Sequence, residues 1–160
     1  MNATTAKARG FTLIEMVVVV LMVSILASAA MPLAALSKKR SQEAQLRQSL
    51  RTIRVALDDY KRAWDQGRIE RKIDQSGYPP NLDVLVKGVV DASSPKAGRI
   101  YFLRSLPRDP FADAALPAAS TWGLRSYASP PDAPVAGGDV FDVYSLTEGV
   151  SLDGTPYRRW

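Results

Sequence analysis

The feature that most constrains this chain is an uncharged apolar run near its N-terminus, within the stretch RGFTLIEMVVVVLMVSILASAAMP. From Met16 to Ser37 the sequence contains no Asp, Glu, Lys or Arg. About 20 apolar residues are enough to span the hydrocarbon core of a bilayer as a helix. Because backbone groups find no water partners in lipid, the run must be helical there, valines included. Pro32 lacks an amide hydrogen, so we expect the helix to kink or loosen near it.

A glutamate, Glu15, lies at the start of this run and distinguishes three interpretations. The run could be a cleaved secretory signal with a small-residue site at Ala27-Ser28-Ala29, or an uncleaved signal anchor. It could instead follow a short basic leader that is cut between Gly10 and Phe11. A carboxylate at the bilayer centre costs about 2.5–3.5 kcal/mol on insertion scales, and less near the interface. Neither of the first two interpretations gives a reason to accept that cost.

The third interpretation gives the glutamate a partner. Cutting after Gly10 makes Phe11 the new N-terminus and exposes its amine. Four residues of helix rise by about 6 Å, so Glu15 lies at a similar depth to that amine. On an axially shifted neighbouring subunit, the carboxylate and the amine could meet directly. The sequence therefore predicts that Glu15 is one half of a contact between subunits.

The same stretch resembles the N-terminal signature of the type IV pilin and type II secretion pseudopilin superfamily. The resemblance rests on Gly-Phe-Thr-Leu-Ile-Glu, residues 10–15, ahead of the apolar run. It implies cleavage by a prepilin peptidase between Gly10 and Phe11 and N-methylation of Phe11. It also implies that Glu15 guides each subunit into a growing filament. Residues 1–10 are then a leader peptide.

The resemblance also supplies the orientation: a single span in the inner membrane, with the C-terminal domain in the periplasm. Positive charges usually mark the cytoplasmic flank of a span. Here Lys38, Lys39 and Arg40 follow the span, and they match or outnumber Lys7 and Arg9 before it. Charge alone therefore does not orient the chain.

Beyond the span, hydrophobic residues recur at steps of four and three, which is typical of an amphipathic helix. This stripe comprises Leu46, Leu50, Ile53, Leu57, Tyr60 and Trp64. The charged residues expected to point outward are Arg47, Arg51, Arg54, Asp58 and Lys61. We predict one helix from about Thr12 to Gln66, ending near Gly67. Its residues 11–37 would form the transmembrane or filament-core half, and residues 38–66 the amphipathic half that packs on the soluble domain.

Residues 67–160 are predicted to form the rest of the soluble domain. A short helix is expected over 82–88, behind two prolines. Strand candidates rich in aromatic and β-branched residues are 99–103, 122–128 and 138–146. One long helix followed by a small antiparallel sheet is an α+β layout, and it is the type IV pilin-like fold that the resemblance implies.

Three blocks in this domain, YPPNLDVLV, LPRDPF and DVFDVYSL, resemble those of the G-type, or major, pseudopilin of type II secretion. The chain has no cysteine, whereas many type IV pilins close a C-terminal loop with a disulfide. The resemblance implies a structural subunit of the pseudopilus, a homo-oligomeric helical filament that helps push folded proteins through an outer-membrane secretin. Its other partners would be minor pseudopilins, the prepilin peptidase and an inner-membrane platform protein. The alternatives are a minor pseudopilin, a type IV pilin subunit, or a periplasmic domain released by an ordinary signal peptide.

The C-terminal segment SLTEGVSLDGTPYRRW has two interpretations. Major pseudopilins typically bind calcium in an acidic loop after the last long strand. Here the candidate oxygen ligands are two carboxylates, one hydroxyl and two main-chain carbonyls: Glu148, Asp153, Ser151, Leu146 and Val150. A calcium shell of about 6–8 oxygens would need further carbonyls or waters. The alternative is a turn at Asp153-Gly154, with Tyr157 and Trp160 packed back on the sheet.

The sequence argues against catalysis and against nucleic-acid binding. It has no histidine and no cysteine, no phosphate-binding glycine loop and no Gly-x-Ser-x-Gly motif. No pairing of a nucleophile with a base is therefore evident. A formal net charge of +5 comes without the dense basic patch or aromatic motif of nucleic-acid-binding proteins. We expect neither an enzyme nor a nucleic-acid-binding protein, and no cofactor other than calcium.

Overall fold

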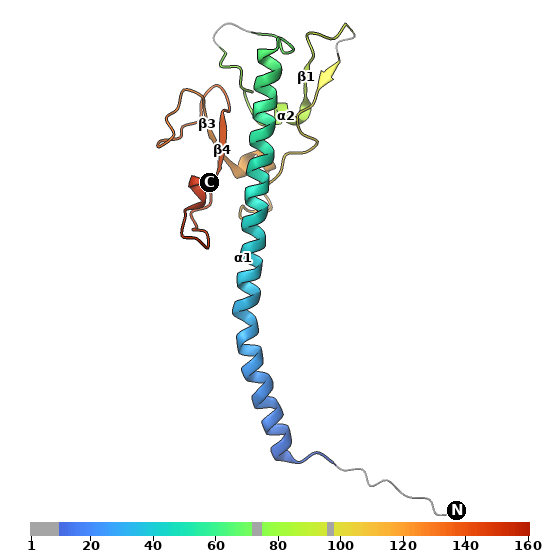
Figure 1. Ribbon diagram of the computed structural model, residues 1–160, viewed down its shortest axis with the longest axis vertical. Coiled ribbons are helices and arrows are strands. Elements are labelled where there is room, and N and C mark those ends of the chain that lie inside the picture. The colour runs from blue at the N-terminus through green and yellow to red at the C-terminus, as the bar shows by residue number, and fades with distance from the viewer. Residues whose placement is uncertain (1–9, 72–74, 96–97) are drawn as a thin grey trace, which may run out of the picture. The chain divides into compact units, whose positions relative to one another are not determined.

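The structure is a computed structural model that describes residues 10–71, 75–95 and 98–160, without the side chains of residues 29–31. Residues 1–9 of the predicted leader lie outside the described residues. The chain divides into two compact units, one ending at Arg40 and the other running from Ser41 to Trp160. Helix α1, Leu13–Asp65, contributes residues to both units (Figure 1).

The bounds of α1 agree with the predicted helix to within one residue at each end. Its C-terminus is closed by Gly67, which takes a φ of 73°. The Gly67 amide donates to the carbonyl of Trp64, and the Arg68 amide donates to that of Ala63, both at 3.0 Å. This is the Schellman arrangement, which favours glycine because an L side chain is strained at positive φ. At Pro32 the helix continues on both sides, and the predicted kink stays a prediction.

The predicted stripe of α1 forms the centre of the core of the second unit. Leu46, Ile53 and Leu57 are almost wholly buried, and Trp64 packs on the core half-buried. Other buried residues come from the rest of the chain: Ile69, Leu82, Leu85, Trp122, Val140, Val143 and Tyr157. Burying this apolar face, rather than helix propensity, is what holds the C-terminal part of α1 in place.

The prediction that the charged residues of α1 all point outward is wrong for Arg54 and Lys61. Arg47, Arg51 and Asp58 are exposed, but Arg54 and Lys61 are half-buried. The Nε of Arg54 donates to Oδ1 of Asp142 at 2.8 Å, and its Nη2 donates to main-chain oxygens further along the chain. Nothing in the local periodicity identifies a partner so distant in sequence.

Helix α2, Asp83–Lys87, lies within the range predicted for it. It is followed by β1, Val89–Val90, which pairs antiparallel with β2, Arg99–Ile100. The strand β1 was not predicted, and the strand predicted over 99–103 ends after Ile100. The reason is a competing acceptor: the amides of Phe102 and Leu103 both donate to the carbonyl of Leu85, at 3.0 and 2.9 Å.

A second two-stranded antiparallel sheet joins β3, Trp122–Arg125, to β4, Asp142–Ser145. Trp122 pairs with Ser145, and Arg125 pairs with Asp142. Both strands are shorter than predicted because adjacent amides bond elsewhere. The Ser126 amide donates to the Val135 carbonyl, and the Val140 amide donates to the Pro79 carbonyl. Two short 3-10 helices complete the unit: η1, Ala118–Thr121, and η2, Tyr157–Arg159. The α+β class is confirmed, and the described residues form two small sheets in place of one.

Candidate functional site

The predicted cleavage site lies immediately before α1, outside regular secondary structure. Gly10, Phe11 and Thr12 precede the first helical residue, and all three are exposed. The Phe11 side chain is 73% exposed. A peptidase needs an accessible backbone that is not locked in a helix, and the Gly10–Phe11 bond meets both conditions.

Glu15 closes a reciprocal cap at the start of α1. Its amide donates to Oγ1 of Thr12 at 3.3 Å, and its Oε2 accepts from the Thr12 amide at 3.5 Å. This is a capping box, in which a threonine and a glutamate three residues apart each satisfy the other's backbone donor. The role of Thr12 was missed from the sequence, although the Thr-x-x-Glu spacing could have revealed it. Within one chain, the Glu15 carboxylate therefore already has a hydrogen-bond partner, the Thr12 amide, but at 3.5 Å this bond is weak.

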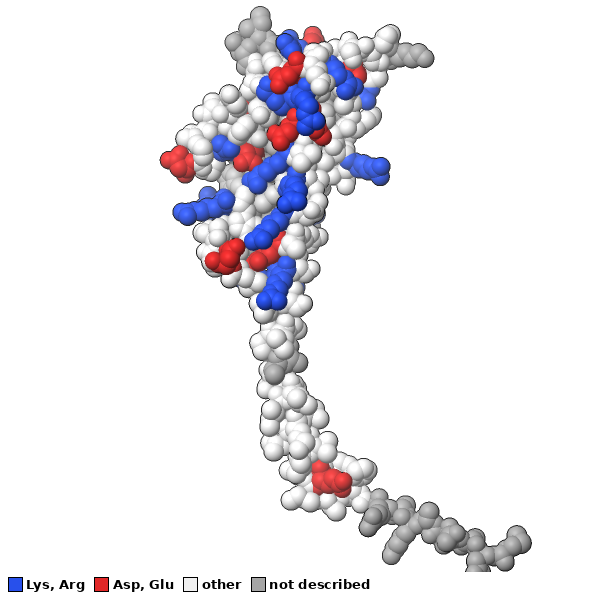
Figure 2. Space-filling model, viewed as in Figure 1, with Lys and Arg blue, Asp and Glu red and all other residues white. Residues whose placement is uncertain are grey.

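The first part of α1 presents an uninterrupted apolar surface. Its described side chains are exposed from Leu13 to Lys38. Its most apolar stretch of 18 residues has a mean hydropathy of 2.5, and none of it is buried. Among the described residues, α1 is the one helix long and apolar enough to cross a membrane. Figure 2 shows this part almost wholly white, whereas Lys, Arg, Asp and Glu gather on the second unit. Such a surface requires lipid or other protein around it.

The polar side chains within the apolar part are satisfied by the helix itself. Oγ of Ser24 donates to the carbonyl of Val20, and Oγ of Ser28 donates to that of Ile25, both at 2.7 Å. Hydroxyls bonded in this way leave no donor unpaired in hydrocarbon. Glu15 differs from these serines because it is charged, and its carboxylate accepts a long bond of 3.5 Å from the Thr12 amide.

The C-terminal loop contains the turn that was one of its two interpretations. Gly154 has a φ of 84°, and its amide donates to the carbonyl of Ser151 at 3.1 Å. Oδ1 of Asp153 accepts from the Thr155 amide at 2.9 Å and also from the hydroxyl of Ser151. These bonds hold the pKa of Asp153 at about 2, well below its usual range. Tyr157 is buried and stacks on Phe111 with ring centroids 4.6 Å apart.

Two residues of α1 that sequence reasoning had not singled out as functional hold this loop. Glu43 is buried, and its Oε1 accepts from the Leu152 amide and the Tyr157 hydroxyl, each at 2.9 Å. Arg47 pairs with Oδ2 of Asp153 at 3.4 Å and lies over the ring of Trp160, 4.2 Å from its centroid. The loop is thereby attached to α1 at several points.

The candidate calcium ligands do not form a cluster of acids. Among the described residues, no group of three or more His, Cys, Asp or Glu is placed to hold a metal ion. Asp153 is occupied by the turn and by Arg47, while Glu148 is exposed. The side chains of Leu146 and Val150 are about half exposed. These residues therefore fit a closed turn better than a calcium shell, and calcium binding itself stays a prediction.

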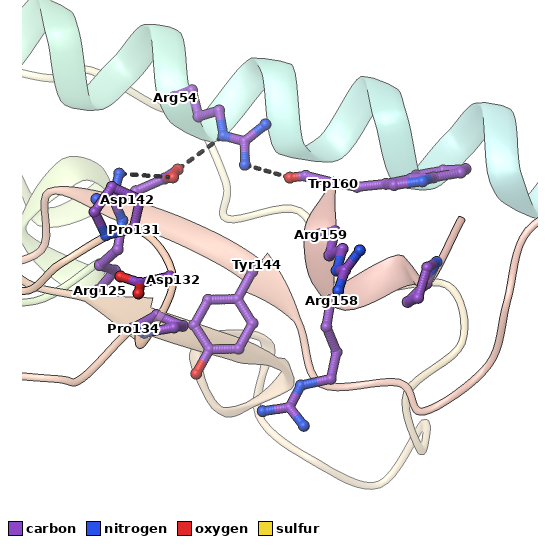
Figure 3. Close-up of a pocket in the computed structure, with 11 residues that line it drawn as sticks. Arg54, Arg125, Pro131, Asp132, Pro134, Asp142, Tyr144, Arg158, Arg159 and Trp160 are labelled. Carbon is purple, nitrogen blue, oxygen red and sulfur yellow. Dashed lines mark hydrogen bonds and ion pairs between the residues drawn. The ribbon is translucent and has the colours of Figure 1, made fainter.

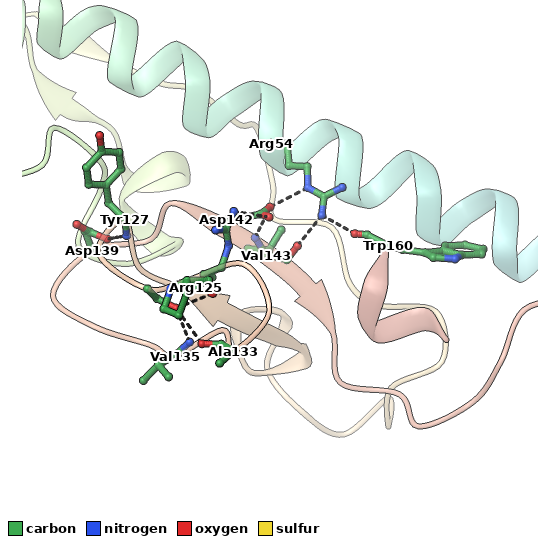
Figure 4. Close-up of polar contacts among 11 residues, drawn as sticks. Arg54, Arg125, Tyr127, Ala133, Val135, Asp139, Asp142, Val143 and Trp160 are labelled. Atoms are coloured by element: carbon green, nitrogen blue, oxygen red, sulfur yellow. Dashed lines mark hydrogen bonds and ion pairs between the residues drawn. The ribbon is translucent and has the colours of Figure 1, made fainter. Parts of the chain in front are cut away.

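A groove of about 800 Å³ lies beside β4, and Figure 3 shows its lining. Asp142 on this strand accepts from both Arg54 and Arg125, at 2.8 and 3.3 Å. These two ion pairs hold the carboxylate between α1 and β3. Arg54 also donates to the main-chain oxygens of Val143 and Trp160 (Figure 4). We therefore interpret the charged residues that line the groove as residues that stabilise the fold.

Comparisons with known proteins agree with this geometry. Residues 5–31 match the prokaryotic N-terminal methylation motif. The chain is 31% identical over 107 residues to the type II secretion system core protein G of Klebsiella michiganensis, covering 64% of this chain and 68% of the relative. It is 30% identical over 109 residues to the core protein G of Klebsiella pneumoniae, covering 66% and 70% respectively. No solved structure matches the chain.

An exposed apolar helix that begins within a methylation motif and continues into a small α+β unit defines a membrane-anchored, type IV pilin-like protein. More specifically, the chain belongs to the type II secretion system core protein G family. The predicted resemblance to the major pseudopilin is confirmed, and with it the role as a pseudopilus subunit. The shared name favours this role over a minor pseudopilin or a type IV pilin. The matched motif, which covers Gly10, Phe11 and Glu15, favours leader cleavage over a secretory signal.

Proposed function

We propose that α1 anchors each new subunit in the inner membrane, with the unit from Ser41 onward in the periplasm. A prepilin peptidase cuts between Gly10 and Phe11, and the Phe11 amine is then methylated. The accessible, non-helical backbone at these two residues supports the proposal, as does their position inside the matched methylation motif. The charges flanking the span do not support either orientation, so this part of the proposal rests on family membership.

The observation that carries the proposal is the cap at Glu15. In the free chain, its carboxylate accepts a long hydrogen bond of 3.5 Å from the Thr12 amide. Cleavage creates a cationic amine at Phe11, and an axially shifted neighbour can bring that amine to Glu15. In a medium of low dielectric, a carboxylate paired with a cationic amine is held more strongly than one that accepts from a neutral amide. Assembly therefore exchanges a weak partner within the chain for a stronger partner on the next subunit.

The exposed apolar surface of α1 supports assembly of many copies of the same chain. In lipid, this surface contacts acyl chains that are as apolar as its own side chains, so it needs no protein contacts. Outside lipid, leaving it exposed to water would cost about 25 cal/mol per Å². Helices of neighbouring copies can cover it, so a subunit moving out of the membrane is favoured only as part of a homo-oligomeric filament.

The remaining partners follow from this role. We expect minor pseudopilins beside this subunit in the filament, an inner-membrane platform protein at its base and the secretin channel in the outer membrane. Both relatives are named as core proteins of a secretion system, which favours a structural role over an enzymatic one.

The intact mass of the membrane-extracted protein tests the processing steps. The proposal predicts a mature chain that begins at Phe11 and carries one methyl group. A Gly10→Leu variant is the control, and it should keep its full leader. A mature chain beginning at Ala30, or an uncut wild-type chain, would contradict the proposal.

A further inference from the structure

The second unit attaches its C-terminal loop to α1 with protein side chains at the place where calcium is expected for this family. We infer that Glu43 and Arg47 of α1 take over the holding role of a cation, so that this loop is fixed without calcium. The inference concerns how the soluble unit is stabilised and does not depend on the filament role.

The first step is the state of Asp153, the better placed of the two candidate carboxylates. One of its oxygens accepts from the Thr155 amide and the Ser151 hydroxyl, and the other pairs with Arg47. A calcium ion at this carboxylate would have to displace the guanidinium of Arg47 or be repelled by it. The Ser151 hydroxyl is also committed, because its single proton lies between the Asp153 side chain and the Thr155 carbonyl, and its oxygen accepts from the Thr155 amide at 3.1 Å.

The second step is Glu43, which receives donors from the loop. Its side chain is buried, and its Oε1 accepts the Leu152 amide and the Tyr157 hydroxyl. A calcium ion organises a loop by drawing its oxygens inward. A carboxylate organises a loop in the opposite sense, by drawing its N–H and O–H groups inward. Here the N–H and O–H groups of the loop point toward α1. Groups in this orientation bind an anion such as the Glu43 carboxylate, and they do not bind a cation.

The third step is the end of the loop, which is fixed from the same helix. Arg47 lies over the ring of Trp160, and Arg54 donates to the main-chain oxygen of Trp160 at 2.5 Å. Tyr157 and Trp160 also pack edge to face, with ring centroids 5.1 Å apart. The exposed Arg47–Asp153 pair alone is weak, since both side chains are more than half exposed. Its effect comes from acting together with the buried contacts of Glu43.

The full-length protein in detergent micelles allows a direct test. We expect the wild-type Tm to be the same in calcium chloride as in the chelator EGTA, and we expect calorimetric titration to show no saturable heat. A rise of the Tm in calcium, or a saturable heat, would overturn the inference. This measurement needs no variant, so it does not depend on the folding of a mutant.

A pair of matched variants separates the two mechanisms. Glu43→Gln keeps the size of the side chain but removes its charge, so amide exchange across Ser151–Thr155 should become roughly threefold to tenfold faster in either buffer. Glu148→Gln removes the other loop carboxylate and should leave exchange unchanged. Faster exchange in Glu148→Gln that appears only in calcium would overturn the inference, as would unchanged exchange in Glu43→Gln.

Discussion

The hydroxyl of Tyr157 donates a hydrogen bond to Oε1 of Glu43 at 2.9 Å, although the two residues lie 114 positions apart in the sequence. The same carboxylate oxygen accepts the Leu152 amide. Together these bonds hold the segment Leu152–Tyr157 against helix α1. A conformational change in the loop would therefore alter a buried hydrogen bond to Glu43 of α1.

This contact predicts a loss of stability at alkaline pH. Burial, together with the hydrogen bond to Glu43, raises the pKa of Tyr157 to about 12. Because the folded-state pKa lies above the unfolded value of 10.0, the contribution is complete below pH 10 and is lost as the pH rises toward 12. Thermal unfolding of the full chain in detergent should show this decline.

Tyr157→Phe is the control for the alkaline transition. The pKa values of Tyr60 and Tyr78 are also raised, chiefly by burial, so the wild-type decline includes their contributions. The variant should be less stable at neutral pH, and its stability should fall less steeply above pH 10. Parallel curves for the two proteins would show that Tyr157 does not titrate in this way.

The lowered pKa of Asp153 predicts a loss of stability at acid pH. Hydrogen bonds from Ser151 and Thr155 lower its pKa from 3.8 to about 2. Its stabilising contribution is therefore present above pH 3.8 and is lost as the pH falls toward 2. Asp153→Asn should flatten the difference in Tm between pH 5 and pH 2, measured by tryptophan fluorescence. Asp91, whose pKa is also about 2 because of Arg68 and Ser93, titrates independently and stays in both proteins.

Arg54 is predicted to matter more for stability than Arg47 or Arg51 of the same helix. Its guanidinium joins Asp142 of β4 to the main-chain oxygens of Val143 and Trp160. Arg54→Met keeps most of the apolar stem but removes one donor from each of these acceptors, although Asp142 keeps its contact with Arg125, at a cost of about 1–3 kcal/mol. The Tm should fall by several degrees. Arg51→Met, at an exposed position on the same helix, should change stability by less than about 0.5 kcal/mol, and equal effects of the two substitutions would contradict this role.

Thr12 is predicted to hold Glu15 in the free subunit. Thr12→Val removes the hydroxyl that accepts the Glu15 amide, at a typical cost of about 1 kcal/mol for the loss of a cap. Amide exchange at Glu15 should become several-fold faster in micelles, while Thr12→Ser should exchange like the wild type. Identical rates in all three proteins would show that the cap is not formed.

The sequence was most informative where a pattern is local and long. The extent of α1 follows from sustained periodicity and a glycine stop, so both of its ends could be predicted. The exposed apolar segment could also be predicted, because lipid imposes a simple rule on composition. The role of Glu15 between subunits stays a prediction. The Thr12 cap was available from the same kind of local signal and was overlooked.

What the sequence could not reveal depends on contacts between distant residues. The two-residue strand β1 is too short to have a pattern, and β2 stops early because the Leu85 carbonyl competes for its amides. Arg54 and Glu43 both resemble ordinary solvent-facing residues of an amphipathic helix. Their partners lie about 90 to 115 positions away and can be identified only once the chain has folded.

A helical reconstruction of the assembled filament by cryo-electron microscopy tests the central claim most directly. The claim is that Glu15 of each subunit is neutralised by the methylated amine of Phe11 on a neighbour. The map should place a carboxylate oxygen of Glu15 within about 3.2 Å of that nitrogen. A Glu15 side chain that faces lipid or solvent, with no cationic group beside it, would contradict the account.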